Sequence, residues 1–121
     1  MLRHLALIFC AGGLGALSRF GLSALVKKLA GGEFPLGTLI VNMLGCLIFG
    51  FLAELITKNH WPPEVRLTCL VGFLGAFTTF SSYISESFHL AQNRLDLALF
   101  NVLFQTLAGF FFLYLGLRLA R

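Results

Sequence analysis

The sequence predicts an all-α membrane protein in which four transmembrane helices form a single domain. Four apolar stretches follow one another along the 121 residues, and 58% of the residues are hydrophobic. Charged residues make up 12% of the chain, about half of the share that soluble domains carry. The net charge of +4 is small and spread along the chain, which argues against a nucleic-acid-binding protein.

The predicted spans cover residues 5–26, 36–57, 67–88 and 97–117. Each has about the 20 residues that cross a hydrocarbon core of roughly 30 Å. The first stretch is longer than the apolar region of a secretory signal and contains Arg19, so we expect a membrane span rather than a cleaved leader. The connectors are short: we expect Gly31 and Gly32 to end the first helix and Pro35 to begin the second. Residues 1–121 are therefore expected to form one four-span domain.

The basic residues divide almost evenly between the two sides of the membrane. One side receives five and the other three, namely Arg3, Lys58, Arg66, Arg118 and Arg121 against Lys27, Lys28 and Arg94. Because orientation follows the side with more lysine and arginine, this small difference specifies it weakly. Two interpretations stay open: both termini in the cytoplasm, which the charge count alone favours, or insertion in both orientations.

Several polar side chains lie inside the predicted spans. Arg19 either faces a water-filled cavity or a partner, or it extends its guanidinium to the membrane edge. Asn42 marks either an ion pathway or a hydrogen bond between helices. Asn101, Gln105 and Gly109 follow at intervals of four and therefore form one stripe on a single helix face.

The segment "GFLGAFTTFSSY" (72–83) places glycines and hydroxyls in the middle of the third span. Gly72 and Gly75 weaken the helix, and Thr78 and Thr79 can hydrogen-bond the backbone groups that a break would free. Irregular backbone at membrane depth survives only where it is buried in protein or lines a cavity. We expect a broken third helix beside an ion pathway, with a kinked but continuous helix as the alternative.

The sequence offers no pattern typical of an enzyme. The three cysteines are isolated and lie in apolar stretches, and the three histidines lie at the edges of the spans (Cys10, Cys46 and Cys69; His4, His60 and His89). They match neither a metal site nor a nucleophile with its base.

Three motifs together resemble the bacterial fluoride channel family, called Fluc or CrcB. They are "GGLGALSRF" (12–20), "GTLIVNMLGC" (37–46) and "GFLGAFTTFSSY" (72–83), and the similarity covers essentially the whole chain. The resemblance implies a fluoride-selective channel that exports fluoride passively across the bacterial inner membrane. It implies an antiparallel, dual-topology homodimer with a structural sodium ion at its centre, which also tips the charge argument toward insertion in both orientations. Pairing with a different subunit is the alternative.

The resemblance also assigns roles to individual residues. It implies that the pore is lined by Arg19, Asn42, Phe80, Ser81, Ser82, Tyr83, Asn101 and Gln105. It implies that the backbone carbonyls of Gly75 and Thr78 hold the sodium, with Thr79 in the break and Glu86 as an acid near the pore. Tyr83 stands where the family usually has Phe, and Asn101 and Gln105 stand where it usually has Tyr and Ser.

These residue types suit a small anion that holds its water tightly. A pore must replace that hydration with several donors, and neutral donors also allow the ion to leave. An aromatic ring has a positive edge that can face an anion. Two rival classes remain: a proton-coupled small multidrug exporter, which needs an acid that the first span lacks, and a scaffold subunit that transports nothing.

Overall fold

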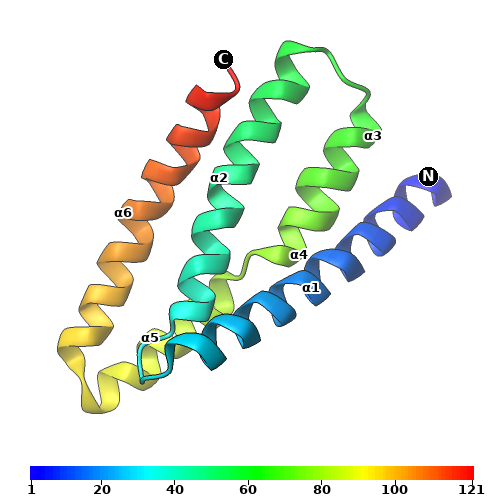
Figure 1. The fold of residues 1–121 in the computed structure, drawn as a ribbon. Helices are drawn as coiled ribbons and strands as arrows, with labels where there is room; N and C mark the ends of the chain where they lie inside the picture. The colour runs from blue at the N-terminus through cyan, green and yellow to red at the C-terminus, as the bar shows by residue number, and fades with distance from the viewer.

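The computed structural model describes residues 1–121 and is helical almost throughout (Figure 1). Its elements are α1 (Leu2–Ala30), α2 (Leu36–Lys58), α3 (Pro63–Arg66), the π-helical segment η1 (Leu67–Leu74), α4 (Gly75–Phe77), α5 (Phe80–Asn93) and α6 (Leu95–Leu119). Four segments are long and apolar enough to cross a membrane, and the third of them runs from Pro63 to Asn93. This confirms the predicted four-span architecture, and each predicted span lies within one of these segments.

The connections lie at opposite ends of the bundle. Both termini and the α2–α3 connection lie toward one end, and the α1–α2 and α5–α6 connections lie toward the other (Figure 1). The first helix ends at Ala30 because Gly31 and Gly32 adopt φ values of 62° and 84°, a region that side chains disfavour. The predicted end of the first helix is thus confirmed.

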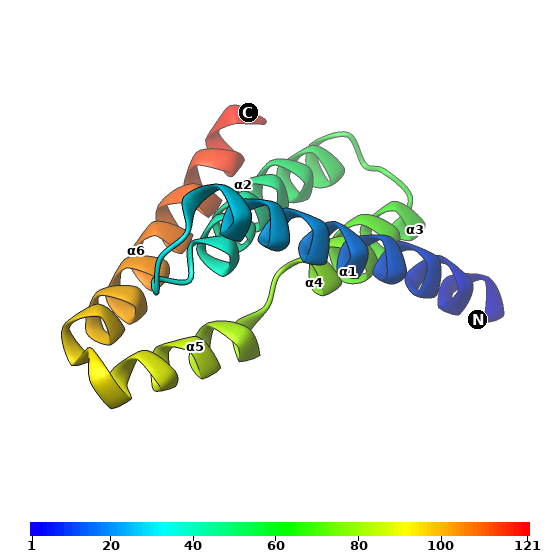
Figure 2. The ribbon, with the colours of Figure 1, turned by 60° about the horizontal axis from the view of Figure 1, so that its bottom comes forward.

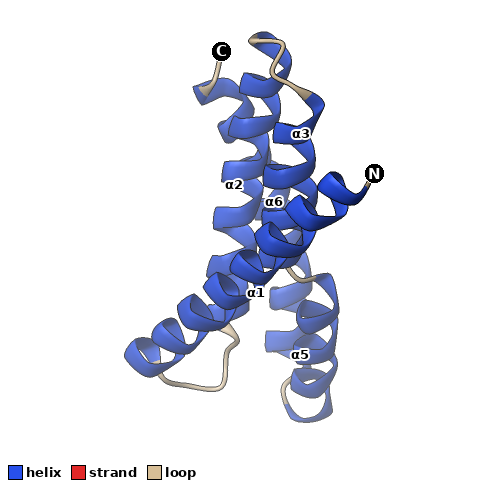
Figure 3. Ribbon diagram, turned by 90° about the vertical axis from the view of Figure 1, so that its right-hand side faces the viewer, coloured by secondary structure: helices blue, strands red, loops and turns tan.

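Helix α2 is central to the packing. It lies along α6, while α1 crosses the bundle at a steep angle and packs on η1 (Figure 3). Both contacts depend on glycines: a Cβ on Gly116 would overlap the Leu47 carbonyl on α2, and a Cβ on Gly15 would overlap the Phe73 carbonyl on η1. Such close approach of backbones is the usual way in which helices associate in lipid.

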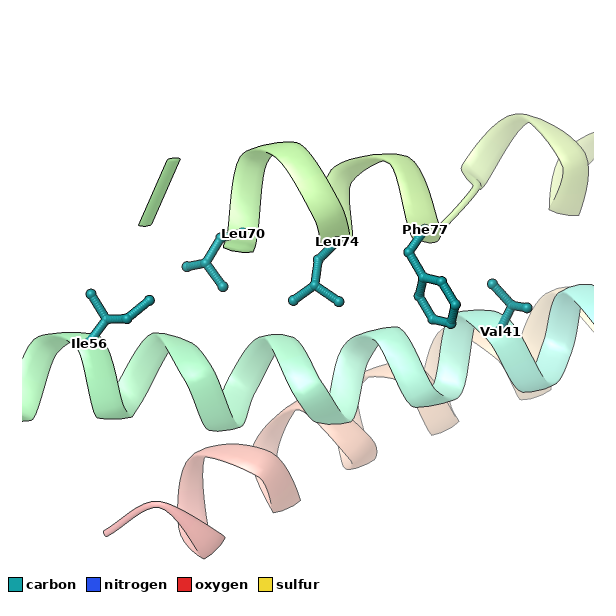
Figure 4. Packing of buried hydrophobic residues seen from close by; sticks show 5 residues of the cluster. All are labelled: Val41, Ile56, Leu70, Leu74 and Phe77. Carbon is teal, nitrogen blue, oxygen red and sulfur yellow. The ribbon is translucent and has the colours of Figure 1, made fainter. Parts of the chain in front are cut away.

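One apolar cluster joins α2 to the first half of the third crossing. Val41 and Ile56 of α2 pack with Leu70, Leu74 and Phe77 of η1 and α4 (Figure 4). The buried cluster stops at Phe77, before α5 begins. The second half of the third crossing is therefore held by other contacts, mainly with α6.

The third crossing is broken between α4 and α5. Thr78 and Thr79 have extended backbones, with φ and ψ of −81° and 157° for Thr78 and −148° and 112° for Thr79. Figure 2 shows this extended stretch and the change in direction that follows it. A broken third helix, rather than a kinked continuous one, is thus confirmed.

Candidate ion pathway at the helix break

Asn42 of α2 holds the break by binding the Thr79 peptide on both sides. The Thr79 N–H donates to Asn42 Oδ1 at 2.9 Å, and Asn42 Nδ2 donates to the Thr79 carbonyl at 3.2 Å. In an unbroken helix the Thr79 N–H would donate to the carbonyl of Gly75, four residues earlier. Asn42 thus replaces that bond and leaves the Gly75 carbonyl without its helical donor.

Thr79 also caps the start of α5. Its Oγ1 accepts from the Ser82 N–H at 3.2 Å and donates to Ser82 Oγ at 2.9 Å, which is the usual N-cap arrangement. Because the Ser82 N–H is used in this way, the Thr78 carbonyl also lacks its helical donor. Gly75 is exposed and Thr78 half-buried on the surface of the single chain.

A hydrogen-bonded series of side chains leads from Asn42 into α6 and back to α5. Asn42 Nδ2 donates to Gln105 Oε1 at 3.0 Å, and Gln105 Nε2 donates to Asn101 Oδ1 at 2.9 Å. Asn101 Nδ2 then donates to Ser87 Oγ at 2.8 Å, and Ser87 Oγ donates to the Tyr83 carbonyl at 2.7 Å. The structure thus brings Asn42 together with Gln105 and Asn101, which lie on one face of the fourth span as their spacing predicted.

Phe80 and Tyr83 form a tilted aromatic pair at the start of α5. Their ring centroids lie 5.7 Å apart at an angle of 57°. Phe80 is 75% exposed, whereas Tyr83 is only 7% exposed. The Tyr83 hydroxyl donates to the Val102 carbonyl at 3.1 Å and lies 3.3 Å from Thr106 Oγ1. The hydroxyl that distinguishes Tyr83 from Phe therefore ties α5 to α6.

An open groove of about 370 Å³ surrounds the break. No aspartate, glutamate, lysine or arginine lines it. Its polar lining consists of Asn42, Thr78, Thr79, Tyr83, Gln105 and Thr106, and Phe80 lies at the same groove. The groove therefore offers uncharged polar groups beside aromatic rings at membrane depth.

A second cavity of about 410 Å³ lies farther along α5, where it is lined by Ser81, Ser82, Ser85 and Glu86. Thr38 Oγ1 donates to Glu86 Oε1 at 2.6 Å, and Glu86 Oε2 is buried without a hydrogen-bond partner. Glu86 is therefore half-buried, and one of its two carboxylate oxygens is bound to α2.

The model of the CrcB-like protein family, described as "CrcB-like protein, Camphor Resistance (CrcB)", matches residues 6–117. The chain belongs to this family. A relative from Solidesulfovibrio magneticus is 46% identical over 123 residues, which cover 100% of this chain and 98% of the relative. Relatives from Nitratidesulfovibrio vulgaris (44% identical, 99% and 98% covered) and Maridesulfovibrio salexigens (40%, 98% and 96%) are similar over their whole lengths. All three are named "Fluoride-specific ion channel FluC".

Not every residue expected in the pathway of this CrcB-like protein lies at the break. Arg19 is half-buried on α1, makes no side-chain hydrogen bond or ion pair, and does not line either cavity. Its role at a pore entrance stays a prediction. Conversely, the sequence analysis missed four hydroxyl residues at the site, namely Thr38, Ser85, Ser87 and Thr106. Spacing gave a signal for two of them, because Thr38 precedes Asn42 by four residues and Ser85 follows Ser81 by four.

Proposed function

We propose that this protein is a fluoride-selective channel that lets fluoride leave the cell passively. The observation that carries the proposal is the uncharged polar groove at the break of the third crossing, in a chain whose relatives are named fluoride-specific ion channels. Irregular backbone at membrane depth is typical of ion pathways.

The groove suits an anion that must lose its water and then leave again. Neutral hydroxyl and amide donors can replace part of the hydration shell without the tight binding of a fixed positive charge. Two hydroxyls beyond the break, those of Ser81 and Ser82, line the second cavity farther along α5. Ser82 Oγ accepts from Thr79 Oγ1, so its own proton is available to an ion, and the proton of Ser81 is engaged only in a long contact of 3.5 Å with Thr79 Oγ1.

The proposal includes an antiparallel homodimer of chains inserted in both orientations. The groove is open on the single chain, and Phe80 beside it is 75% exposed. A second copy would cover Phe80 and close the groove, which one four-helix chain leaves open. The near-even division of basic residues agrees with insertion in both orientations. Pairing with a different subunit is the alternative.

A structural sodium ion fits the carbonyls of the break. The Gly75 and Thr78 carbonyls have both lost their helical donors, because Asn42 and Thr79 take the N–H groups that would bind them. Unwound backbone carbonyls are typical sodium ligands in membrane proteins. Two carbonyls from each subunit would hold the ion, whose fixed positive charge would raise the local potential for anions.

We place the channel in the bacterial inner membrane as a multi-pass protein. Four apolar segments support a multi-pass membrane protein, and passive export from the cytoplasm requires this membrane. A proton-coupled exporter is disfavoured because α1 contains no acidic residue, so the first span offers no site for proton exchange.

Fluoride release from proteoliposomes tests this function. Vesicles loaded with fluoride and containing the purified protein are opened to potassium flux with valinomycin, and the released fluoride is followed with an electrode. We expect fast release that needs no proton gradient, while protein-free vesicles retain fluoride. Release that depends on a proton gradient, or no release above the protein-free vesicles, would contradict the proposal.

A further inference from the structure

We propose that Gln105, Asn101 and Ser87 are positioning residues: they form a buried hydrogen-bond chain that fixes how Asn42 holds the helix break, and they do not contact the transported ion. This differs from the role that the family resemblance assigns to Asn101 and Gln105, namely lining the pore. The effect on transport rests on the proposed fluoride channel, whereas the arrangement of the chain itself does not.

The donor-to-acceptor direction of this hydrogen-bond chain is set at its Asn42 end by a backbone donor, the Thr79 N–H. The Thr79 N–H can only donate, so Asn42 must turn Oδ1 toward it and Nδ2 away from it. One Nδ2 proton then binds the Thr79 carbonyl and the other binds Gln105. Gln105 must therefore present its oxygen to Asn42 and its nitrogen to Asn101.

The other end is set by a backbone acceptor. Asn101 accepts from Gln105 and therefore donates to Ser87 Oγ. Ser87 in turn passes its single proton to the Tyr83 carbonyl, which can only accept. Reversing any one amide would place donor against donor or acceptor against acceptor at one or more of its contacts, and reversing Asn101 would also take the Ser87 proton from the Tyr83 carbonyl. Each member of the chain consequently has one orientation that satisfies its neighbours.

Burial separates most of this chain from the groove. Asn101 is fully buried, and Gln105 and Ser87 are each 6% exposed. Asn101 and Ser87 do not line the groove, and Gln105 lines it although it is almost fully buried. Within a membrane, a buried amide that loses its partner has no water to replace it. The free-energy cost of leaving any one of these polar groups unpaired therefore keeps the hydrogen-bond chain intact.

The route of the chain shows what it positions. It leaves the third crossing at Thr79, passes through α2 and α6, and returns to α5 at Ser87 and Tyr83. The extended backbone at the break separates α5 from the rest of the third crossing, and α5 contributes nothing to the buried apolar cluster. This circuit of hydrogen bonds thus links α5 to Asn42, beside the bonds that join Tyr83 to α6 and Glu86 to α2.

A chain with one direction differs measurably from a set of independent hydrogen bonds. Independent bonds predict that removing the Ser87 hydroxyl affects only Asn101 and Tyr83. A connected chain predicts that the same change leaves Asn101 Nδ2 without its acceptor, so that Asn101 moves, Gln105 follows, and the environment of the Asn42 amide changes. Two residues, Asn101 and Gln105, separate Ser87 from Asn42 in this chain.

Side-chain amide NMR of the purified full chain with ¹⁵N-labelled asparagine and glutamine gives this readout. The Asn42 resonance is assigned by its absence from Asn42→Ser. We expect Ser87→Ala to shift it and Ser87→Thr, which keeps the hydroxyl, to restore it. Thr68→Val is the matched control, because it also removes a hydroxyl that donates to the carbonyl four residues earlier, and it should leave Asn42 unchanged. If Ser87→Ala does not give folded protein, Asn101→Leu cuts the same chain.

Fluoride release from proteoliposomes completes the test. We expect Ser87→Ala to slow release about tenfold and Ser87→Thr to restore it. An unmoved Asn42 resonance in Ser87→Ala or Asn101→Leu overturns the proposal. A shifted resonance with wild-type release also overturns it, since the positioning would have no bearing on transport. If the wild type releases no fluoride, the proposed function fails. The Asn42 resonance alone then supports or overturns the proposed hydrogen-bond chain.

Discussion

The side chain of Asn42 binds both the N–H and the carbonyl of Thr79, at 2.9 and 3.2 Å, across 37 positions of sequence. An amide side chain thus takes the place of helical backbone bonds at the point where the third crossing opens. Both backbone groups of Thr79 are hydrogen-bonded as a result, and membrane-embedded backbone tolerates irregularity only where it is buried in protein or lines a cavity. Asn42 is accordingly the residue on which the candidate pathway depends most.

Asn42→Asp is expected to lower fluoride release by at least about tenfold. The carboxylate can still accept from the Thr79 N–H, but its second oxygen faces the Thr79 carbonyl and repels both that group and an anion in the groove. Proteoliposome release is the measurement. Asn59→Asp, at the exposed end of α2, is the matched control and should conduct normally. Wild-type release from Asn42→Asp would refute the role of this amide.

Gly45→Ala is expected to disturb the break from the α2 side. A Cβ at this position would overlap Cγ2 of Thr78, so the extended segment must move, and we expect fluoride release to fall about tenfold. Thr78→Ser removes that methyl group and keeps the hydroxyl, so the double variant should recover release. Gly13→Ala, where a Cβ meets nothing within 4 Å, is the control. Failure of the double variant to recover would show that the overlap is not the cause.

Tyr83→Phe is expected to affect stability more than transport. The hydroxyl donates to the Val102 carbonyl, and hydrogen bonds within membranes contribute about 0.6 kcal/mol on average. We therefore expect a small loss of thermal stability, with fluoride release within about twofold of the wild type. A large loss of release at unchanged stability would instead place the hydroxyl in the ion pathway.

Insertion in both orientations is expected from the division of basic residues, five on one side and three on the other. Two C-terminal reporters, one active only in the cytoplasm and one active only outside it, should both give signal when fused to this chain. Adding two lysines at the C-terminus should bias insertion toward one orientation, so that one reporter gives more signal than the other. Signal from a single reporter in the unmodified chain would contradict dual insertion.

The sequence predicted the features that depend on local composition. The four spans follow from the lengths of the apolar stretches, and the end of the first helix follows from Gly31 and Gly32. The break at Thr78 and Thr79 followed from glycines and hydroxyls within one span. Each of these depends on residues close together in the chain, so one sequence contains the information.

The sequence could not predict which side chains meet across helices. Hydropathy places a residue along its own helix, but it does not give the rotation of that helix or the neighbour it faces. The bond between Thr38 and Glu86 joins residues 48 positions apart, and nothing in the two local sequences indicates that they meet. For the same reason, the sequence could not predict that Asn42 bonds to Thr79 and Gln105, or that the Tyr83 hydroxyl bonds to the Val102 carbonyl.

The measurement that tests the central claim most directly is the reversal potential of the protein in a planar bilayer. The two chambers would contain a tenfold gradient of fluoride, equal chloride and equal pH. A passive fluoride-selective pathway predicts a reversal potential near the fluoride equilibrium value of about 59 mV, unchanged when a proton gradient is added. A reversal potential near zero, or one that follows the proton gradient, would contradict the account.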